Sequence, residues 1–206
     1  ERNPELLWQI LREIIIEDKE FEARFQLNLV GTVSQSILKN LEKYSLTHYV
    51  NIVGYVSHKE AITFQKKSQI LLLIEIDSEE TKCIIPGKLF EYMVSNRPII
   101  AIGPGDSDVE QIIRETNTGS YFNYSEHKRL KNIILEHFVA FQNANLQSHP
   151  IGLEQYSRKS LTKQLAMLIL KINDQAPKFK IKVWNFVLFV ICNLIKTYGN
   201  STKSDI

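Results

Sequence analysis

At 206 residues the chain is long enough to bury the core of one ordinary domain. Hydrophobic residues make up 44% of it and charged residues 23%, a composition typical of a globular protein rather than a disordered or fibrous one. The 25 lysine and arginine residues nearly balance the 23 aspartate and glutamate residues, which leaves a formal net charge of +2. So small a charge gives a nucleic-acid-binding function no electrostatic support.

The cysteines and the start of the chain indicate the compartment in which the protein is found. Cys83 and Cys192 lie far apart and form no metal-binding or disulfide pattern, which favours a reducing cytoplasm. The chain opens with Glu1 and Arg2, not with the apolar core of a secretory signal or an initiator methionine. We therefore expect a cytoplasmic protein, seen as a fragment.

The first half of the chain alternates between helix and strand patterns. Apolar residues recur at helical spacing over 4–17, with Pro4 in the first turn, where proline is tolerated. Short apolar runs that stop at Gly31 and Gly54 predict strands over 25–30 and 50–53. Helices are expected over 36–44 and 58–67.

The second half continues the same alternation. The run 69–75 is apolar on both faces, as a central parallel strand covered by helices on both sides must be. After it we expect a helix over 87–95, a strand over 98–102, a helix over 106–117 and a strand near Tyr121.

This order predicts an α/β fold with a Rossmann-like, doubly wound parallel sheet built from right-handed βαβ units. The first helix has no preceding strand to cross over from, so we expect a truncation within a βαβ unit, with the first strand missing. Extra C-terminal helices are expected over 126–143 and 153–172. The predicted domains are a nucleotide-sugar-binding domain, 1–174, and a basic and hydrophobic tail, 175–206.

Ligands of open α/β sheets bind beyond the carboxyl ends of the strands, which directs attention to four loops. Two of these loops lie at Gly31 and Gly54, and the other two span residues 76–86 and 103–106. The loop 76–86 is the most informative because it is long, whereas loops between a strand and a helix usually have about 2–6 residues. It leads into Pro86, Gly87 and Lys88 at the start of a predicted helix.

Lys88 lies at the positive end of that helix, where its charge is unfavourable unless an anion is present. A bound phosphate would resolve this conflict, since the amides of Gly87 and Lys88 would face it. Glu91, one turn further on, can accept two hydrogen bonds from a ribose diol. The alternative is that Lys88 reaches into water and Glu91 complements the helix dipole, and physical reasoning alone leaves both open.

The segment PGKLFEYMVSNRPIIAIGPGDSDVEQII (86–113), followed by Thr118 and Gly119, resembles the C-terminal donor-binding domain of GT-B glycosyltransferases related to family 4. Upstream, LNLVG (27–31) and VNIVGYVSHKEAITFQKKSQILLLIE (50–75) match the same pattern in order and spacing. The resemblance covers residues 4–172. It implies that the chain is the C-terminal half of a GT-B fold and binds a nucleotide-diphospho sugar.

The resemblance also implies roles for individual residues. Glu91 corresponds to the glutamate that holds the nucleotide ribose. Pro86, Gly87 and Lys88 correspond to the turn at the diphosphate. Tyr55 and Val56 correspond to the backbone segment that lines the base, and Gly31 to the glycine where the backbone approaches the donor. Ser57 and His58, beside the base-lining segment, are further candidates for contact with the donor.

One position departs from the family pattern. The family has a second glutamate eight positions before the ribose glutamate, where it contacts the transferred sugar, and this chain has Cys83 there. Glu79 or Glu80 can substitute for it only through the geometry of the loop. Asp106 and Asp108 have the spacing of a metal-binding pair, but Asp106 is expected to be a helix N-cap, so no metal or other cofactor is expected.

The reaction implied is transfer of a sugar from a nucleotide-diphospho sugar to a glycan or lipid-linked acceptor in polysaccharide biosynthesis. Amides and a cation would stabilise the departing diphosphate. In the tail, the apolar run 183–195 is flanked by lysines and is shorter than the about 20 residues that span a bilayer. It favours an interfacial helix at the inner membrane face, or else a helix packed on a missing N-terminal acceptor-binding domain or in an oligomer.

Two alternatives to this glycosyltransferase function stay open. One is a GT-B nucleotide-sugar epimerase. The other is a non-catalytic pseudoenzyme that binds nucleotide or a partner protein, and the cysteine at position 83 is the feature that favours it.

Overall fold

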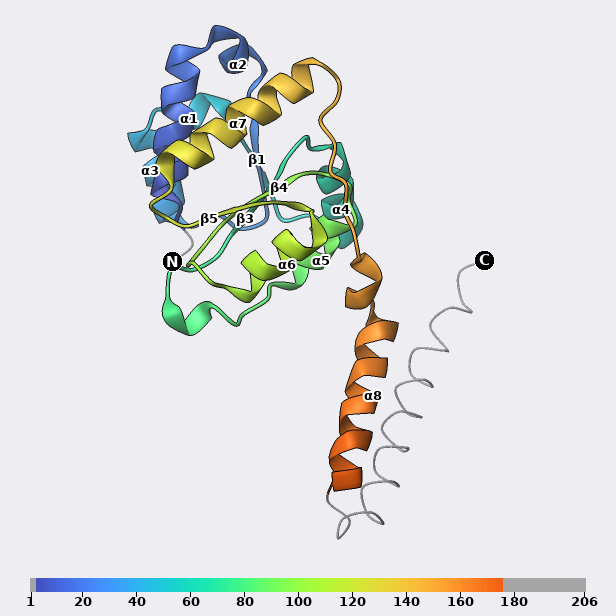
Figure 1. The fold of residues 1–206 in the computed structure, drawn as a ribbon. Coiled ribbons are helices and arrows are strands. Elements are labelled where there is room, and N and C mark those ends of the chain that lie inside the picture. Colours follow the sequence, from blue (N-terminus) through green and yellow to red (C-terminus); the bar gives the residue numbers. More distant parts are fainter. Residues whose placement is uncertain (1–2, 176–206) are drawn as a thin grey trace. The chain divides into compact units, whose positions relative to one another are not determined.

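The computed structural model describes residues 3–175, which form two compact units that divide after Leu153 (Figure 1). The first unit contains both sheets and helices α1 to α7. The second contains helix α8 (Arg158–Gln175), and the short 3-10 helix Leu153–Tyr156 lies at the division. Almost all of the predicted tail, including the apolar run 183–195, lies outside the described residues. The predicted domain boundary at 174 stays a prediction.

The strands of the described region pair in parallel and form two sheets. One sheet consists of β1 (Leu27–Val30) and β2 (Val50–Gly54), with Leu27 opposite Val50. The other has the order β3–β4–β5, from strands Leu71–Ile74, Ile99–Ile102 and Gly119–Phe122. All-parallel pairing with a helix between successive strands is the α/β arrangement that the sequence predicts.

The division between the two sheets falls between β1 and β3, which can be compared with the Rossmann-like strand order. In that order, 3-2-1-4-5-6, the first strand lies between the second and the fourth. The two sheets here, β2–β1 and β3–β4–β5, reproduce the order on either side of that position. The break between β1 and β3 lies at the position where the sequence analysis expects the first strand.

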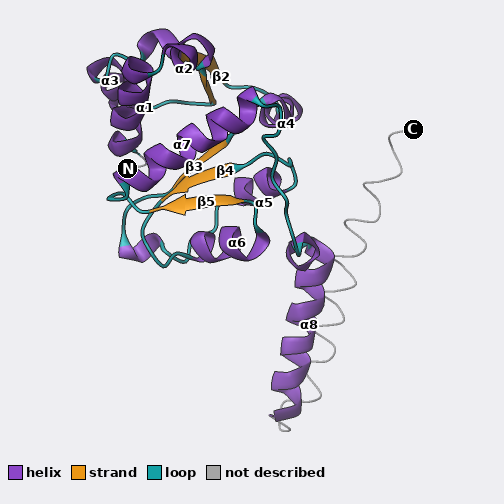
Figure 2. Ribbon diagram, turned by 45° about the horizontal axis from the view of Figure 1, so that its top comes forward, coloured by secondary structure: helices purple, strands orange, loops and turns teal. Residues whose placement is uncertain are grey.

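Helices cover both faces of the three-stranded sheet. Figure 2 shows β3, β4 and β5 between α7 on one side and α5 and α6 on the other, which is the doubly wound arrangement. Helix α1 packs against α7, and α6 packs against β5. The helices of the first unit are α1 (Glu5–Glu17), α2 (Lys19–Arg24), α3 (Gln35–Lys43), α4 (His58–Lys67), α5 (Gly87–Met93), α6 (Asp108–Thr116) and α7 (His127–Gln142).

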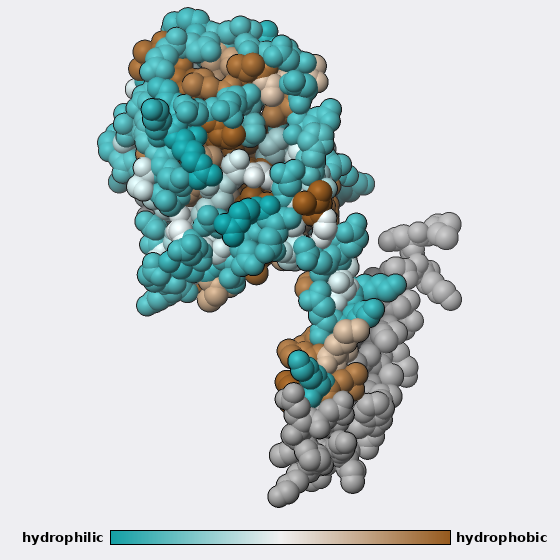
Figure 3. Space-filling model, viewed as in Figure 1, coloured by the Kyte–Doolittle hydropathy of each residue, from teal (hydrophilic) through white to brown (hydrophobic). Residues whose placement is uncertain are grey.

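The hydrophobic core gathers around α1. Its buried residues recur at helical spacing, with Leu6 half-buried beside them: Leu7, Trp8, Ile10, Leu11, Ile14 and Ile15. They share one cluster with Leu41 of α3, Ile100 of β4 and Phe122 of β5. Leu29 of β1 and Leu72 of β3 pack against the same cluster, so α1 joins the two sheets. On the face of the first unit seen in Figure 3, hydrophilic residues predominate and apolar residues show as smaller patches among them.

Two details differ from the expectations. The strand paired on both sides is β4, which is buried at all four positions, whereas β3 pairs on one side only and alternates between buried and half-buried. The short helix α2 was not predicted, because Phe21 is its only buried residue and one apolar residue makes no periodic pattern. The side chain of Asp18 caps it, accepting from the amides of Glu20 and Phe21.

Candidate functional site

Two helices begin beyond the carboxyl ends of strands from the two sheets, α4 after β2 and α5 after β3. Helix α4 starts with a complete capping box, in which the Glu60 amide donates to Ser57 Oγ at 3.3 Å and the Ser57 amide donates to Glu60 Oε2 at 2.9 Å. The box fixes the start of α4 and so places His58 in its first turn. Ser57, which was predicted to contact the nucleotide-sugar donor, thus has a structural role as the N-cap of α4.

Glu91 projects from α5 toward α4. Its Oε1 lies 3.0 Å from Nε2 of His58, and its Oε2 accepts from Nε2 of Gln65 at 3.0 Å. The side chain of Glu91 is 37% exposed and that of His58 is 76% exposed. The carboxylate therefore lies at the surface between two helices, neither in the core nor detached in solvent.

The electrostatics of Glu91 keep it ionised at neutral pH. The hydrogen bonds from Gln65 and then His58 hold the pKa of the Glu91 carboxyl below its ordinary value, and its partial burial opposes them. An ionised carboxylate has about four lone-pair positions for hydrogen bonds. Two are used here, so Glu91 can still accept from a diol.

Gln65 is the contributor that the sequence analysis missed. It lies seven residues after His58, two turns along α4, so both side chains project from the same face of the helix. That spacing was visible in the sequence, but nothing in it indicated that this face meets α5. Only the tertiary packing shows that Gln65 orients Glu91.

The turn before Glu91 begins at an extended residue. Pro86 is extended (φ −69°, ψ 133°) and provides no side-chain cap to α5. Gly87 is exposed and Lys88 is half-buried. Because α5 has only seven residues, its dipole is small, and the geometry around Glu91 is the stronger feature of the site.

The predicted glycines occupy backbone conformations that favour glycine. Gly31 has φ 107° and Gly54 has φ 76°, and the Gly31 amide donates to the carbonyl of Gly54 at 2.7 Å, which joins the ends of β1 and β2. Just after Gly54, the Tyr55 side chain is 92% exposed and Val56 is half-buried. These residues lie on the loop that leads directly to His58.

The candidate substitutes for the missing glutamate lie in the loop between β3 and α5. Glu79 and Glu80 lie in the 3-10 helix Glu79–Thr81 and are exposed, and Glu79 forms its ion pair with Lys82 at 2.8 Å. Cys83 is an exposed free thiol in the same loop.

The expectation that Asp106 caps a helix is wrong by one residue. Asp106 has φ 61°, in the left-handed region, and the N-cap of α6 is Ser107, whose Oγ accepts from the Glu110 amide at 3.1 Å. The Ser-x-x-Glu spacing at 107–110 was the signal for this cap. Across residues 3–175, no group of three His, Cys, Asp or Glu side chains is placed to hold a metal ion.

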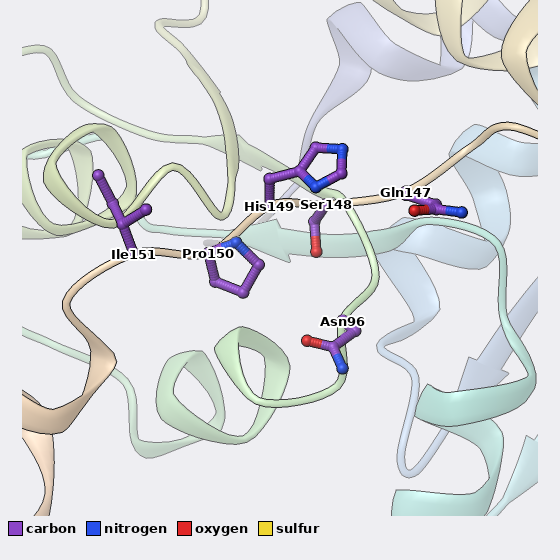
Figure 4. Close-up of a pocket in the computed structure, with 6 residues that line it drawn as sticks. All are labelled: Asn96, Gln147, Ser148, His149, Pro150 and Ile151. Carbon is purple, nitrogen blue, oxygen red and sulfur yellow. The ribbon is translucent and has the colours of Figure 1, made fainter.

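The two pockets described for the first unit lie elsewhere. One is lined by Asn96 and residues 147–151 (Figure 4), near the amino ends of the strands. There, Asn117 donates to the carbonyl of His149 at 2.9 Å. The other lies along β5 and is lined in part by Arg114 and Arg129. Neither contains a predicted site residue.

Within the described part of the chain, no helix combines the length and apolar character needed to cross a bilayer.

Neither a known protein-family profile nor the sequence of a curated protein matches the chain. Solved structures do resemble it. HepE of Anabaena, determined in complex with UDP, has 13% sequence identity and a TM-score of 0.49, over 68% of this chain and 38% of that one. Sucrose-phosphate synthase of Thermosynechococcus elongatus has 16% identity and a TM-score of 0.53, over 84% of this chain and 42% of that one.

The chain thus spans about two fifths of the length of each of these two structures. At such low identity, the similarity to sucrose-phosphate synthase is a similarity of fold. It confirms the predicted Rossmann-like α/β fold.

Proposed function

We propose that this chain binds the nucleotide-diphospho sugar donor of a glycosyl transfer reaction. The observation that supports the proposal most directly is the geometry of Glu91, an ionised, half-exposed carboxylate that His58 and Gln65 orient beyond the ends of β2 and β3. A ribose diol needs such an acceptor. The fold shared with part of sucrose-phosphate synthase, and the resemblance of segment 86–113, favour the same ligand class.

In this proposal each candidate has a defined task. The Glu91 carboxylate accepts from the ribose hydroxyls, and the amides of Gly87 and Lys88 together with the Lys88 ammonium attract the diphosphate. Tyr55 and Val56 line the base. The backbone at Gly31 lies close to the donor. Stabilisation of the leaving diphosphate needs only these amides and the cation, so we propose a reaction without a metal or another cofactor.

The proposal extends to the rest of the protein. The sugar would pass to a glycan or lipid-linked acceptor held by a second domain, in cytoplasmic polysaccharide biosynthesis at the inner membrane face. Sucrose-phosphate synthase extends well beyond the 42% of its chain that matches this one, which is in keeping with the proposal of a second domain. Transfer activity therefore needs both domains.

Calorimetry with UDP, GDP and ADP tests the proposal. We expect one of the three to bind the intact protein, and Glu91→Ala to weaken that binding by about 1.5–3 kcal/mol, because the variant loses hydrogen bonds to a charged acceptor. Glu42→Ala, at an exposed position of α3, serves as the control and should leave the affinity unchanged. Unchanged affinity in a folded Glu91→Ala variant would remove Glu91 from the site.

A second candidate function is nucleotide binding without transfer. The observation that favours it is Cys83, an exposed thiol at the position where the resembled family has a sugar-contacting glutamate. Nucleotide binding by the intact protein with no hydrolysis or transfer of any nucleotide sugar would favour this candidate. Turnover that survives Cys83→Ser would exclude it.

A further inference from the structure

A buried polar network lies at the carboxyl end of the three-stranded sheet, apart from Glu91. Glu75, the residue after β3, is only 5% exposed. Its Oε2 accepts from the Tyr121 hydroxyl at 2.6 Å and from the Ser107 hydroxyl at 3.2 Å. The Ser107 hydroxyl also lies 2.9 Å from the Tyr121 oxygen. Three side chains from separate parts of the chain thus meet at one carboxylate oxygen.

The fold makes room for this network. A Cβ on Gly103 would lie 2.2 Å from the Tyr121 hydroxyl oxygen and 2.6 Å from Glu75 Oε2, so only glycine allows the approach. Burial and the hydrogen bond to Glu75 hold the pKa of Tyr121 well above its ordinary value, and Tyr121 therefore stays protonated and able to donate. The Tyr121 hydroxyl also lies 2.8 Å from the carbonyl oxygen of Pro104.

The network anchors two loops. The Glu75 amide donates to the carbonyl of Ile102 at 2.9 Å, and the Glu75 carbonyl accepts from the Tyr124 hydroxyl at 2.7 Å. Glu75 therefore fixes the start of the loop 76–86. Ser107 caps α6, and the next amide, that of Asp108, donates to the carbonyl of Lys82 at 2.9 Å, which holds the middle of the same loop.

Stability alone does not account for a buried carboxylate. Removing it from water costs several kcal/mol, and an apolar replacement of similar shape is often neutral or stabilising. A fully hydrogen-bonded buried network instead favours one conformation over its alternatives. The conformation held here is that of the loop that ends at Pro86, directly before Gly87 and Lys88.

We propose that Glu75 is a positioning residue, which acts through Tyr121 and Ser107 to hold the loop 76–86 in the conformation that receives a nucleoside diphosphate. The second half of this statement rests on the proposed function. The first half concerns the loop alone and can be measured without a ligand.

Tyr121→Phe in the intact protein tests the proposal, because it removes one oxygen and keeps the ring. Tyr49→Phe is the matched control, since its hydroxyl donates to Glu22 Oε1 at 2.7 Å, away from this loop. Glu75→Gln is the conservative variant, because its amide oxygen can still accept from Tyr121 and Ser107. The readouts are hydrogen exchange of the amides of residues 77–85 and the affinity for UDP, GDP and ADP.

We expect Tyr121→Phe to speed exchange of these amides by about tenfold, because their hydrogen bonds lie within a loop that has lost its anchor. It should weaken nucleoside diphosphate binding by about tenfold. Glu75→Gln and Tyr49→Phe should each stay within about twofold of the wild type in both readouts. The first keeps an acceptor oxygen for Tyr121 and Ser107, and the second removes a hydroxyl that lies away from the loop.

Unchanged exchange of residues 77–85 in folded Tyr121→Phe would overturn the proposal, as would an equal increase in Tyr49→Phe. Faster exchange with unchanged nucleotide affinity would overturn the link to the ligand. If the wild type binds no nucleoside diphosphate, the proposed function fails. The exchange measurement then still decides whether Glu75 holds the loop.

Discussion

Glu91 shows how a surface carboxylate becomes a defined acceptor. On an exposed helix a glutamate samples many rotamers, but here two side chains of α4 hold both of its oxygens. Gln65 and His58 thereby reduce the entropy that a ligand must otherwise remove on binding. The identity of Glu91 as a candidate came from the sequence. Its orientation by Gln65 did not, because the contact joins residues 26 positions apart.

A titration of Glu91 tests this arrangement. The pKa of its carboxyl is lowered in the folded state, so its contribution to stability is present above the unfolded-state pKa and is lost as the pH falls through the folded-state pKa. Gln65→Ala should raise the Glu91 pKa toward its ordinary value, as followed by carboxyl NMR. Gln69→Ala, at an exposed glutamine that bonds the Lys67 carbonyl, should leave it unchanged. A Glu91 pKa that is the same in all three proteins would contradict the account.

At the scale of elements, the accuracy of the sequence-based expectations follows from how local each signal is. Helix α4 was expected at its observed bounds from a pattern within a single short segment. The capping box of Ser57 and Glu60 that the structure shows at its start likewise depends only on neighbouring residues. The parallel pairing of all five described strands was expected, since a helix between successive strands predicts βαβ units. Which strand is central depends on pairing, and no local pattern distinguishes the apolar runs of β3 and β4.

The capping box predicts a measurable cost for its loss. Ser57→Ala should destabilise the protein by about 1 kcal/mol in urea denaturation, because the Glu60 amide loses its acceptor at the start of α4. Ser57→Thr keeps a hydroxyl at that position and should retain most of the stability. Equal stability of the two variants would show that the box does not hold the start of α4.

In the first unit as a whole, helix α1 connects the two sheets through the hydrophobic cluster. Its buried face belongs to a cluster that also contains residues of α3, β4 and β5, while strands of both sheets pack against it. The two sheets are not joined by strand hydrogen bonds, so this cluster is what makes them one unit. Periodicity identified the buried face of α1 correctly, but its position across two sheets could not be predicted from the sequence.

Two isoleucines of α1 test this connection. Ile14 is fully buried and Ile16 is 58% exposed. Ile14→Ala should lower the free energy of unfolding by about 2–5 kcal/mol through lost burial and a residual cavity. Ile16→Ala should change it by no more than about 0.5 kcal/mol. Similar effects of the two substitutions would contradict the position of α1 in the core.

The most direct test of the central claim compares a ribonucleoside diphosphate with its 2′-deoxy and 3′-deoxy analogues, in the wild type and in Glu91→Ala. If Glu91 accepts from the ribose diol, removing a hydroxyl costs the wild type about 1.5–3 kcal/mol of binding energy and costs Glu91→Ala almost nothing. An equal loss in both proteins would show that the ribose is recognised elsewhere, and that Glu91 is not part of a donor site.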